Sequence, residues 1–281
     1  MKPAPVRSFA LVGPGRAGTS VALALLARGR RAVGVAGRTP DAPSTRAAVA
    51  RLGGPPRALA EVGRGAALVV VATPDAAIEA VAAAIAPGIE PGALVVHCSG
   101  ARGLDALAPL ALARPDVALG ALHPLQTFAA PDPGRLAGAW AAVAGPPAVT
   151  ELALDLGLRP VVVPDDRRAA YHAAAVVASN HLVALLGQVT RLADTAGVPV
   201  EAFWPLVDAT VANVEARGAA DALTGPVARG DLATVAAHLD AIDPAECATY
   251  AELALAALAL TGRDDPALRV LLTGARGEVP A

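Results

Sequence analysis

The 281-residue sequence predicts an α/β protein in which a doubly wound, mostly parallel sheet is followed by an all-α C-terminal domain. Two patterns support this prediction. Strand-like apolar runs alternate with helix-like runs as far as Val163, as in a parallel sheet with helices on both faces. After Pro164-Asp165-Asp166, apolar residues recur at helical spacing only. We therefore expect two domains, residues 1–165 and residues 166–281.

The expected strands are short apolar runs bounded by turn residues. The run at 67–72 is apolar throughout, which is typical of a parallel strand buried on both faces. The complete set of strand-like runs is 9–12, 32–36, 67–72, 93–97, 117–122, 140–144 and 160–163. Helix-like runs lie between them, at 19–27, 43–51, 76–86 and 148–156.

The second half is expected to consist of helices. Asp165 or Asp166 can cap a helix of roughly 30 residues, which ends at the helix stop Gly197-Val198-Pro199. The segment 223–231 interrupts the helical pattern, and its last residue, Asp231, is expected to cap the next helix. Further helices are expected at 200–216, 231–241, 245–260 and 266–272.

A glycine-rich turn, Gly13-Pro14-Gly15-Arg16-Ala17-Gly18, lies between the first strand and the first helix. This context is the one that a dinucleotide-binding Rossmann fingerprint requires. Gly13 permits the tight turn, Gly15 lets the backbone approach a pyrophosphate, and Gly18 lets helix and strand pack closely. The amides at the helix start would face the phosphates. We expect the whole turn to bind a nucleotide cofactor.

Arg38 and Thr39 follow the second strand, where an NAD-binding chain places an acidic residue on the ribose 2′-hydroxyl. A guanidinium can instead hold a 2′-phosphate through charge-assisted hydrogen bonds, and Thr39 adds a hydroxyl donor. An arginine at a strand end can also be simply solvated. The pattern favours NADP(H) as the cofactor.

Polar residues follow later strands, and ligands of doubly wound sheets bind outside these strand ends. Thr73-Pro74 either ends its strand as a simple turn or lines the nicotinamide ribose. Ser99 is a further candidate cofactor contact after the fourth strand. His97 and His123 end the fourth and fifth strands; each is either a hydrogen-bonded structural residue or a group at the substrate. We expect His97 to contact substrate and His123 to be catalytic.

The long helix carries polar residues on an otherwise apolar sequence. His172 and Ser179 are seven positions apart and share a face, with Asn180 adjacent. Buried polar groups need partners, so core hydrogen bonding is the alternative to a catalytic role for His172 and Asn180. Within 223–231, Thr224 and Arg229 are candidates for binding a substrate carboxylate, although Arg229 is equally plausible in a surface ion pair.

Composition excludes several functions. The net charge of −2 gives no broad electrostatic case for binding nucleic acid or anionic membranes. Cys98 and Cys247 have no metal-ligand spacing, so no metal is expected, and a reducing cytoplasm is the default location. The N-terminus lacks the apolar core of a signal peptide, and the apolar stretches are too short or too polar to span a membrane. Lys2 is the sole lysine, so no interior lysine is available for catalysis.

Four motifs together resemble a known family. They are the glycine turn, Leu122-His123-Pro124-Leu125-Gln126-Thr127-Phe128, Ala178-Ser179-Asn180 and Leu223-Thr224-Gly225-Pro226-Val227-Ala228-Arg229-Gly230-Asp231. The chain resembles, over nearly its whole length, bacterial Rossmann-like proteins with a C-terminal helical domain of unknown function. That family is similar to the 6-phosphogluconate and β-hydroxyacid dehydrogenases, pyrroline-5-carboxylate reductase, prephenate dehydrogenase and ketopantoate reductase.

The resemblance implies helices that form a homodimer, a small-molecule substrate, and long-helix residues facing the nicotinamide. By position, Asn180 matches best and His172 next. Many of these relatives use a lysine on that helix, and this chain has none there. The proton donor would then be His172, His123 or a water held by Asn180, whereas an imine substrate can arrive already protonated.

The expected function is an NADP(H)-dependent oxidoreductase that reduces a small keto acid or imine carboxylate. Ketopantoate-like compounds and cyclic imino acids are the candidate substrates. The alternative is a catalytically silent NADP(H)-binding sensor or scaffold, because a fold does not establish an activity.

Overall fold

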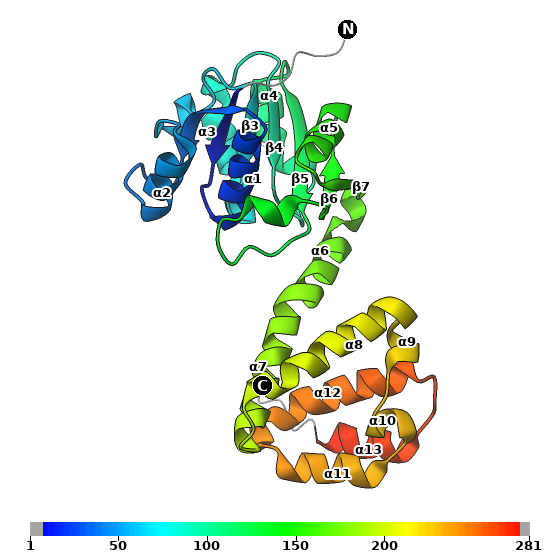
Figure 1. Cartoon of the computed structure of the whole chain (residues 1–281). Coiled ribbons are helices and arrows are strands. Elements are labelled where there is room, and N and C mark those ends of the chain that lie inside the picture. Colours follow the sequence, from blue (N-terminus) through cyan, green and yellow to red (C-terminus); the bar gives the residue numbers. More distant parts are fainter. Residues whose placement is uncertain (1–7, 276–281) are drawn as a thin grey trace. The chain divides into compact units, whose positions relative to one another are not determined.

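The computed structural model describes residues 8–275. The chain divides into two compact units, Met1–Ser179 and Asn180–Ala281. The first contains every strand of the described chain, and the second contains only helices (Figure 1). The predicted order of a sheet-containing domain followed by an all-α domain is therefore confirmed.

The first unit is built on a seven-stranded sheet with the order β2-β1-β3-β4-β5-β6-β7. Neighbouring strands are parallel except β5 and β6, which are antiparallel. The strand order reverses between β1 and β3, so the carboxyl ends of these two strands flank the switch point where doubly wound sheets bind ligands. The strands are β1 Ser8–Val12, β2 Arg31–Ala36, β3 Leu68–Val71, β4 Leu94–His97, β5 Ala118–Pro124, β6 Trp140–Ala144 and β7 Arg159–Val162.

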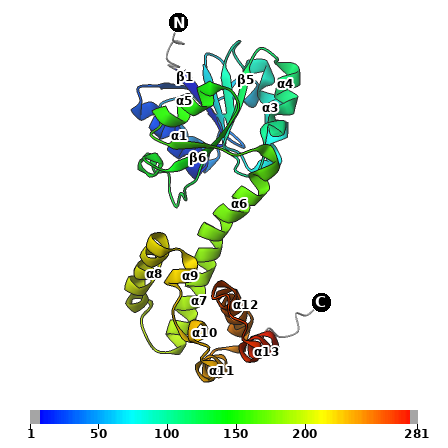
Figure 2. The same ribbon diagram turned by 90° about the vertical axis from the view of Figure 1, so that its right-hand side faces the viewer.

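Helices cover both faces of this sheet (Figure 2). In β3, Leu68 and Val70 belong to one apolar core with α1, α2 and α5. Val69 and Val71 belong to the opposite core with α3 and α4, because successive side chains in a strand alternate between faces. The helices are α1 Arg16–Ala27, α2 Pro43–Leu52, α3 Ile78–Ile85, α4 Ala108–Ala113, α5 Pro147–Asp155 and α6 Arg168–Val176.

The second unit is a helical cluster around a small aliphatic core, which includes Val235, Leu258, Leu268 and Leu272. The predicted cap is confirmed, since the Asp231 carboxylate accepts a hydrogen bond from the Thr234 amide at 3.1 Å. The helices are α7 Leu182–Thr195, α8 Trp204–Arg217, α9 Ala219–Ala222, α10 Pro226–Arg229, α11 Leu232–Ala241, α12 Pro244–Leu260 and α13 Pro266–Gly274.

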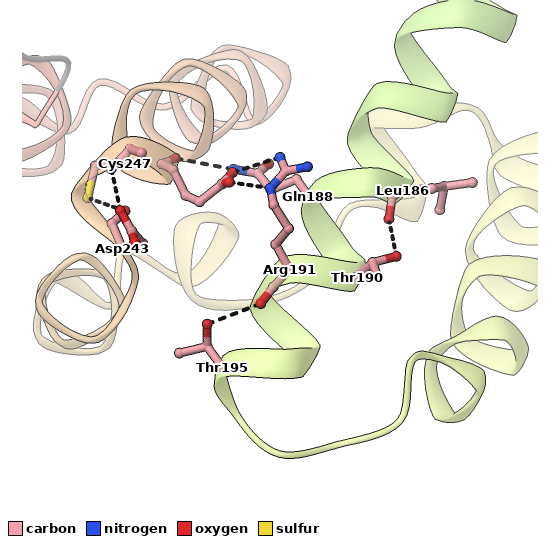
Figure 3. A network of polar contacts seen from close by, with 9 residues as sticks. Leu186, Gln188, Thr190, Arg191, Thr195, Asp243 and Cys247 are labelled. Atoms are coloured by element: carbon pink, nitrogen blue, oxygen red, sulfur yellow. Dashed lines mark hydrogen bonds and ion pairs between the residues drawn. The ribbon is translucent and has the colours of Figure 1, made fainter.

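Polar contacts attach α7 to α12 (Figure 3). Gln188 is buried, and its amide nitrogen donates to the Glu246 carbonyl oxygen at 3.2 Å. Arg191 forms an ion pair with the Glu246 carboxylate. Nearby, the Cys247 thiol donates to the Asp243 carbonyl oxygen at 3.6 Å. The contacts of Gln188 and Arg191 with Glu246 fix the position of α7 against α12.

The long helix differs from its prediction in two respects. It is interrupted by a π-helical segment, Val177–His181, at the division between the compact units. The expected domain boundary at residue 165 stays a prediction, and α6 is hydrogen-bonded to the sheet through Tyr171 and His123. Asp165 does not cap the helix either; its carboxylate accepts a hydrogen bond from Nε of Arg168.

Within the described residues, the segment Asp165–Thr195 is long and apolar enough to cross a membrane by length and composition. Such a segment is weak evidence for a membrane span. The beginning of this segment is attached to the sheet. Arg168 is completely buried, and Tyr171 is hydrogen-bonded to His123 near the end of β5.

Candidate functional site

The glycine turn has the geometry that its sequence predicts. Gly13 has φ +82°, and its amide donates to the Ala36 carbonyl at 2.8 Å, which ties the turn to the end of β2. A Cβ on Gly13 would lie 2.6 Å from the Ala72 backbone, and one on Gly18 would lie 2.6 Å from the Ala72 side chain. A Cβ on Gly15 would meet no atom within 4 Å. Gly13 and Gly18 are therefore required because a side chain would clash there, whereas the backbone at Gly15 has free space beside it.

A pocket of about 190 Å³ adjoins this open backbone at the N-terminus of α1. The first turn of α1 contains no acidic residue, so the partial positive charge of the helix terminus is not offset there. Exposed amides, a helix N-terminus and arginine side chains suit a phosphate-containing ligand. The lining residues are Pro14, Gly15, Arg16, Thr19, Ser44, Ala47, Ala48, Arg51 and Pro131.

The other predicted cofactor residues differ in their surroundings. Arg38 and Thr39 are exposed at the carboxyl end of β2, as their prediction requires. Thr73 has a buried hydroxyl with no hydrogen-bond partner among the residues that the structure describes, and Pro74 is exposed. Ser99 is buried, and its hydroxyl oxygen accepts hydrogen bonds from two local amides, at 3.0 and 3.2 Å.

His97 ends β4 and is completely buried. The Ser99 amide donates to Nδ1 at 3.2 Å, so the ring proton lies on Nε2 and is donated to the Gly103 carbonyl at 3.0 Å. Burial, and then the positive charge of Arg168, lower the pKa of His97 to about 4. Both ring nitrogens are thus hydrogen-bonded to backbone groups of the loop that follows β4. This arrangement is that of a hydrogen-bonded structural histidine.

His123 in β5 and Tyr171 in α6 form a hydrogen-bonded pair, with 2.8 Å between Nδ1 and the phenolic oxygen. The His172 ring lies beside them, its centroid 6.1 Å from that of His123. Gly100 provides the room for both imidazoles, because a Cβ there would lie 2.7 Å from Cδ2 of His172 and 2.9 Å from Nε2 of His123. The structure therefore brings together two predicted catalytic residues, His123 and His172.

The protonation of this pair follows from its surroundings. Burial, followed by the charges of His172 and Arg168, lowers the pKa of His123 to about 4. Burial raises the pKa of Tyr171, and Arg168 opposes that rise. At neutral pH the imidazole is therefore uncharged and the phenol keeps its proton.

Arg168 is a member of this cluster that the sequence analysis did not select. Its side chain is completely buried, and Nε donates to the Asp165 carboxylate at 3.1 Å. Nη1 and Nη2 are buried without a hydrogen-bond partner in the described part of the chain. Arg168, Tyr171 and His172 occupy positions i, i+3 and i+4 of α6 and share one face. This spacing of three polar residues on an alanine-rich helix is the feature of the sequence from which Arg168 could have been selected as a site residue.

Three predicted residues belong to the second compact unit and stay predictions. Asn180 lies in the π-helical segment, and Thr224 lies between α9 and α10. Arg229 ends α10 near Asp231, whose pKa is lowered first by hydrogen bonds from Thr234 and then by Arg229. Within residues 8–275, no group of three or more His, Cys, Asp or Glu side chains could hold a metal ion.

Comparisons with known proteins agree with this architecture. Residues 2–124 match the model of a Rossmann-like domain, and residues 141–257 match a domain of unknown function (DUF2520). The chain thus combines these two domains, as the resemblance implied. The second match includes the last two strands as well as the helices. No protein of curated function matches the chain in sequence.

Several solved structures share the fold. One is a putative NADP oxidoreductase from Bacteroides fragilis, with 24% identity and a TM-score of 0.78 over 90% of this chain and 98% of that one. A reductive aminase from Aspergillus terreus, solved with NADPH4, cyclohexanone and allyl amine, has 20% identity and a TM-score of 0.58 over 97% and 94%. A pyrroline-5-carboxylate reductase from Coxiella burnetii has 15% identity and a TM-score of 0.57 over 97% and 98%.

Proposed function

We propose that the chain is an NADP(H)-dependent oxidoreductase that reduces a small keto acid or imine carboxylate. The observation that carries the proposal is the hydrogen bond between Tyr171 and His123, at the same edge of the sheet as the open glycine turn. The fold is shared with proteins described as an NADP oxidoreductase, a reductive aminase and a pyrroline-5-carboxylate reductase, which supports both the cofactor and the reaction class.

The residues of the nucleotide site fit NADP(H). The turn from Gly13 to Gly18 would hold the pyrophosphate, and Arg38 with Thr39 would hold the 2′-phosphate. Thr73, Pro74 and Ser99 follow β3 and β4 and would line the nicotinamide ribose. When bound, the cofactor supplies a hydride to the substrate carbon.

The chain's own contribution is the movement of a proton. A neutral imidazole accepts a proton more readily than a phenol oxygen does, so we assign the hydrogen of the pair to Tyr171, which donates to Nδ1 of His123. The proton of that imidazole then lies on Nε2. Reduction of a carbonyl leaves an alkoxide oxygen, which takes the Nε2 proton while Nδ1 takes the phenol proton from Tyr171. A solvent proton then replaces the one lost from Nε2, and Nδ1 returns its proton to the phenolate of Tyr171, which restores the starting pair.

The reduction of an imine depends less on this proton relay than the reduction of a carbonyl does. A protonated imine needs no further proton on nitrogen during the transfer of a hydride to carbon. The positive charge of Arg168 near His123 favours an acidic substituent on the substrate over a basic one. His172 is proposed to orient the substrate beside His123, whereas His97 supports the turn that carries Ser99.

The test is an assay of NADPH oxidation with ketopantoate, short 2-keto acids and cyclic imino acids. Turnover of at least one compound, with NADPH preferred over NADH, is expected. Tight binding of NADPH without turnover of any compound would favour the sensor or scaffold alternative. Loss of turnover in His123→Asn, with unchanged affinity for NADPH, would place the proton transfer at this cluster.

We also propose a homodimer formed through the helical unit. Helix α8 has no buried residue within the single chain, although it carries Trp204, Leu206, Val211 and Val214. On α7, Val183 is 69% exposed. Large apolar side chains that gather at the surface are typical of protein–protein contacts. The two cysteines are free, in keeping with a cytoplasmic location.

A further inference from the structure

Arg168 carries a charge that its surroundings only partly compensate. The guanidinium is completely buried, and two of its three nitrogens lack a partner within the described residues. Its carboxylate partner, Asp165, has a side chain that is 54% exposed, so water screens that negative charge. A buried ion without full compensation is destabilising, and its retention calls for a physical reason.

The charged and titratable groups around Arg168 come from several elements. Tyr171 and His172 share its helix face, and the charge of Arg168 acts on His97 and His123 at the ends of β4 and β5. Asp75, after β3, acts on both histidines with the opposite sign, and Asp105, after β4, does so on His97. Neither aspartate contacts the buried nitrogens of Arg168. The phenol of Tyr171 lies one helical turn away on this face, and the charge of Arg168 acts to lower its pKa against the effect of burial.

The proposed relay creates a negative charge at that position. When the phenol proton of Tyr171 passes to His123, the phenol oxygen becomes a phenolate in a half-buried site. A charge that develops during reaction is best stabilised by a fixed group of opposite sign that is already in place. Arg168 has this relationship to Tyr171 before any ligand binds.

We propose that Arg168 is a positioning residue whose buried positive charge stabilises the phenolate formed on Tyr171 during proton transfer through His123. The inference rests on the proposed relay, but the electrostatic relationship can be measured without substrate or cofactor. A purely structural Arg168 would support the start of α6 without changing the ionisation of Tyr171.

The sequence makes a direct measurement possible, because it contains only two tyrosines. In the full chain carrying Tyr250→Phe, Tyr171 is the sole tyrosine, and the ultraviolet absorbance of tyrosinate reports its ionisation alone. Arg168→Gln in this background should raise the titration midpoint by about one pH unit or more. Arg168→Lys should restore most of the original midpoint. The matched control, Arg167→Gln, removes an exposed neighbouring charge and should change it far less.

An unchanged midpoint in folded Arg168→Gln would overturn the inference, even if the enzyme proved active. A raised midpoint in a chain that reduces no substrate would support it and would count against the proposed function alone. If Arg168→Gln does not fold, Asp165→Asn provides the second test, because it leaves Arg168 in place without its counter-ion. The midpoint should then fall, and a midpoint that stays or rises would overturn the inference.

Discussion

The phenolic oxygen of Tyr171 lies 2.8 Å from Nδ1 of His123, although the two residues are 48 positions apart in the chain. The helical unit contains a second pair with the same local geometry, since the Tyr250 oxygen lies 2.8 Å from Nδ1 of His238. Both pairs have edge-to-face rings at 90°. The pairs differ in their neighbours, because the first has His172 and the buried Arg168 beside it. The second pair is therefore a control for the first.

Removal of the Tyr171 hydroxyl should slow the reduction of a carbonyl substrate. We expect Tyr171→Phe to lower kcat by about 10²- to 10⁴-fold, the range for loss of a positioned proton donor, with little change in the affinity for NADPH. A protonated imine should lose much less. Steady-state kinetics on both substrate types measure the effect. Tyr250→Phe should retain the parental rates, and an equal loss in both variants would argue against a relay through Tyr171.

A side chain at Gly100 should displace the two imidazoles. A Cβ there would lie within 3 Å of both the His123 and the His172 rings, so Gly100→Ala should lower turnover at least tenfold while the fold is retained. Kinetics and circular dichroism measure the two effects separately. Gly274→Ala is the control, because its Cβ would meet no atom within 4 Å. Full activity in Gly100→Ala would show that the spacing of these rings is not required.

Arg38 should determine the choice of cofactor. Loss of its charge-assisted hydrogen bonds in Arg38→Asp should weaken the binding of NADPH by about 10- to 100-fold and that of NADH by less than about threefold. Calorimetry or fluorescence titration measures both dissociation constants. Arg31→Asp changes an exposed arginine at the other end of β2 and should affect neither. Similar losses for the two cofactors in Arg38→Asp would refute the 2′-phosphate assignment.

Stability should fall on acidification through His97. Its pKa is about 4 in the folded chain and about 6.5 in the unfolded chain, so the unfolded state binds more protons between these pH values. The free energy of unfolding should therefore decrease by about 1.4 kcal/mol per pH unit as the pH falls from about 6.5 to about 4, and this residue should add no pH dependence above 6.5. Urea unfolding between pH 5 and 7 measures the slope, and His97→Asn should make it shallower. An identical slope in that variant would exclude His97 as a source.

A charge on α7 should disrupt the proposed dimer. Val183 is 69% exposed in the single chain, and burying a carboxylate there on association would be strongly unfavourable. Val183→Asp should therefore convert a dimer to a monomer, as measured by light scattering after size exclusion. Val270→Asp is the control, because Val270 is 74% exposed but lies on α13. A parental chain that is monomeric throughout would contradict the proposal.

Much of the fold was predictable because its signals are local. The runs that form β1 to β7 are short, apolar and bounded by turn residues, and their alternation with helical runs requires a mostly parallel sheet. The roles of the three glycines of the turn were predictable one by one, because each position needs a residue without a side chain for its own reason. These glycines are Gly13, Gly15 and Gly18. The π-helical segment Val177–His181 was not predictable, because no proline or glycine within it marks a break in the helix.

The sequence by itself determined the sheet, the nucleotide-binding turn and the two histidines at strand ends, because these depend on neighbouring residues. Only the tertiary structure decided which polar groups meet. Tyr171 contacts His123 because α6 returns to the carboxyl ends of β4 and β5. Nη1 and Nη2 of Arg168 are left without a partner among the described residues because the folded chain buries this side chain completely. Burial and partner choice are properties of packing between distant segments, so the sequence could supply the residues but not their relationship.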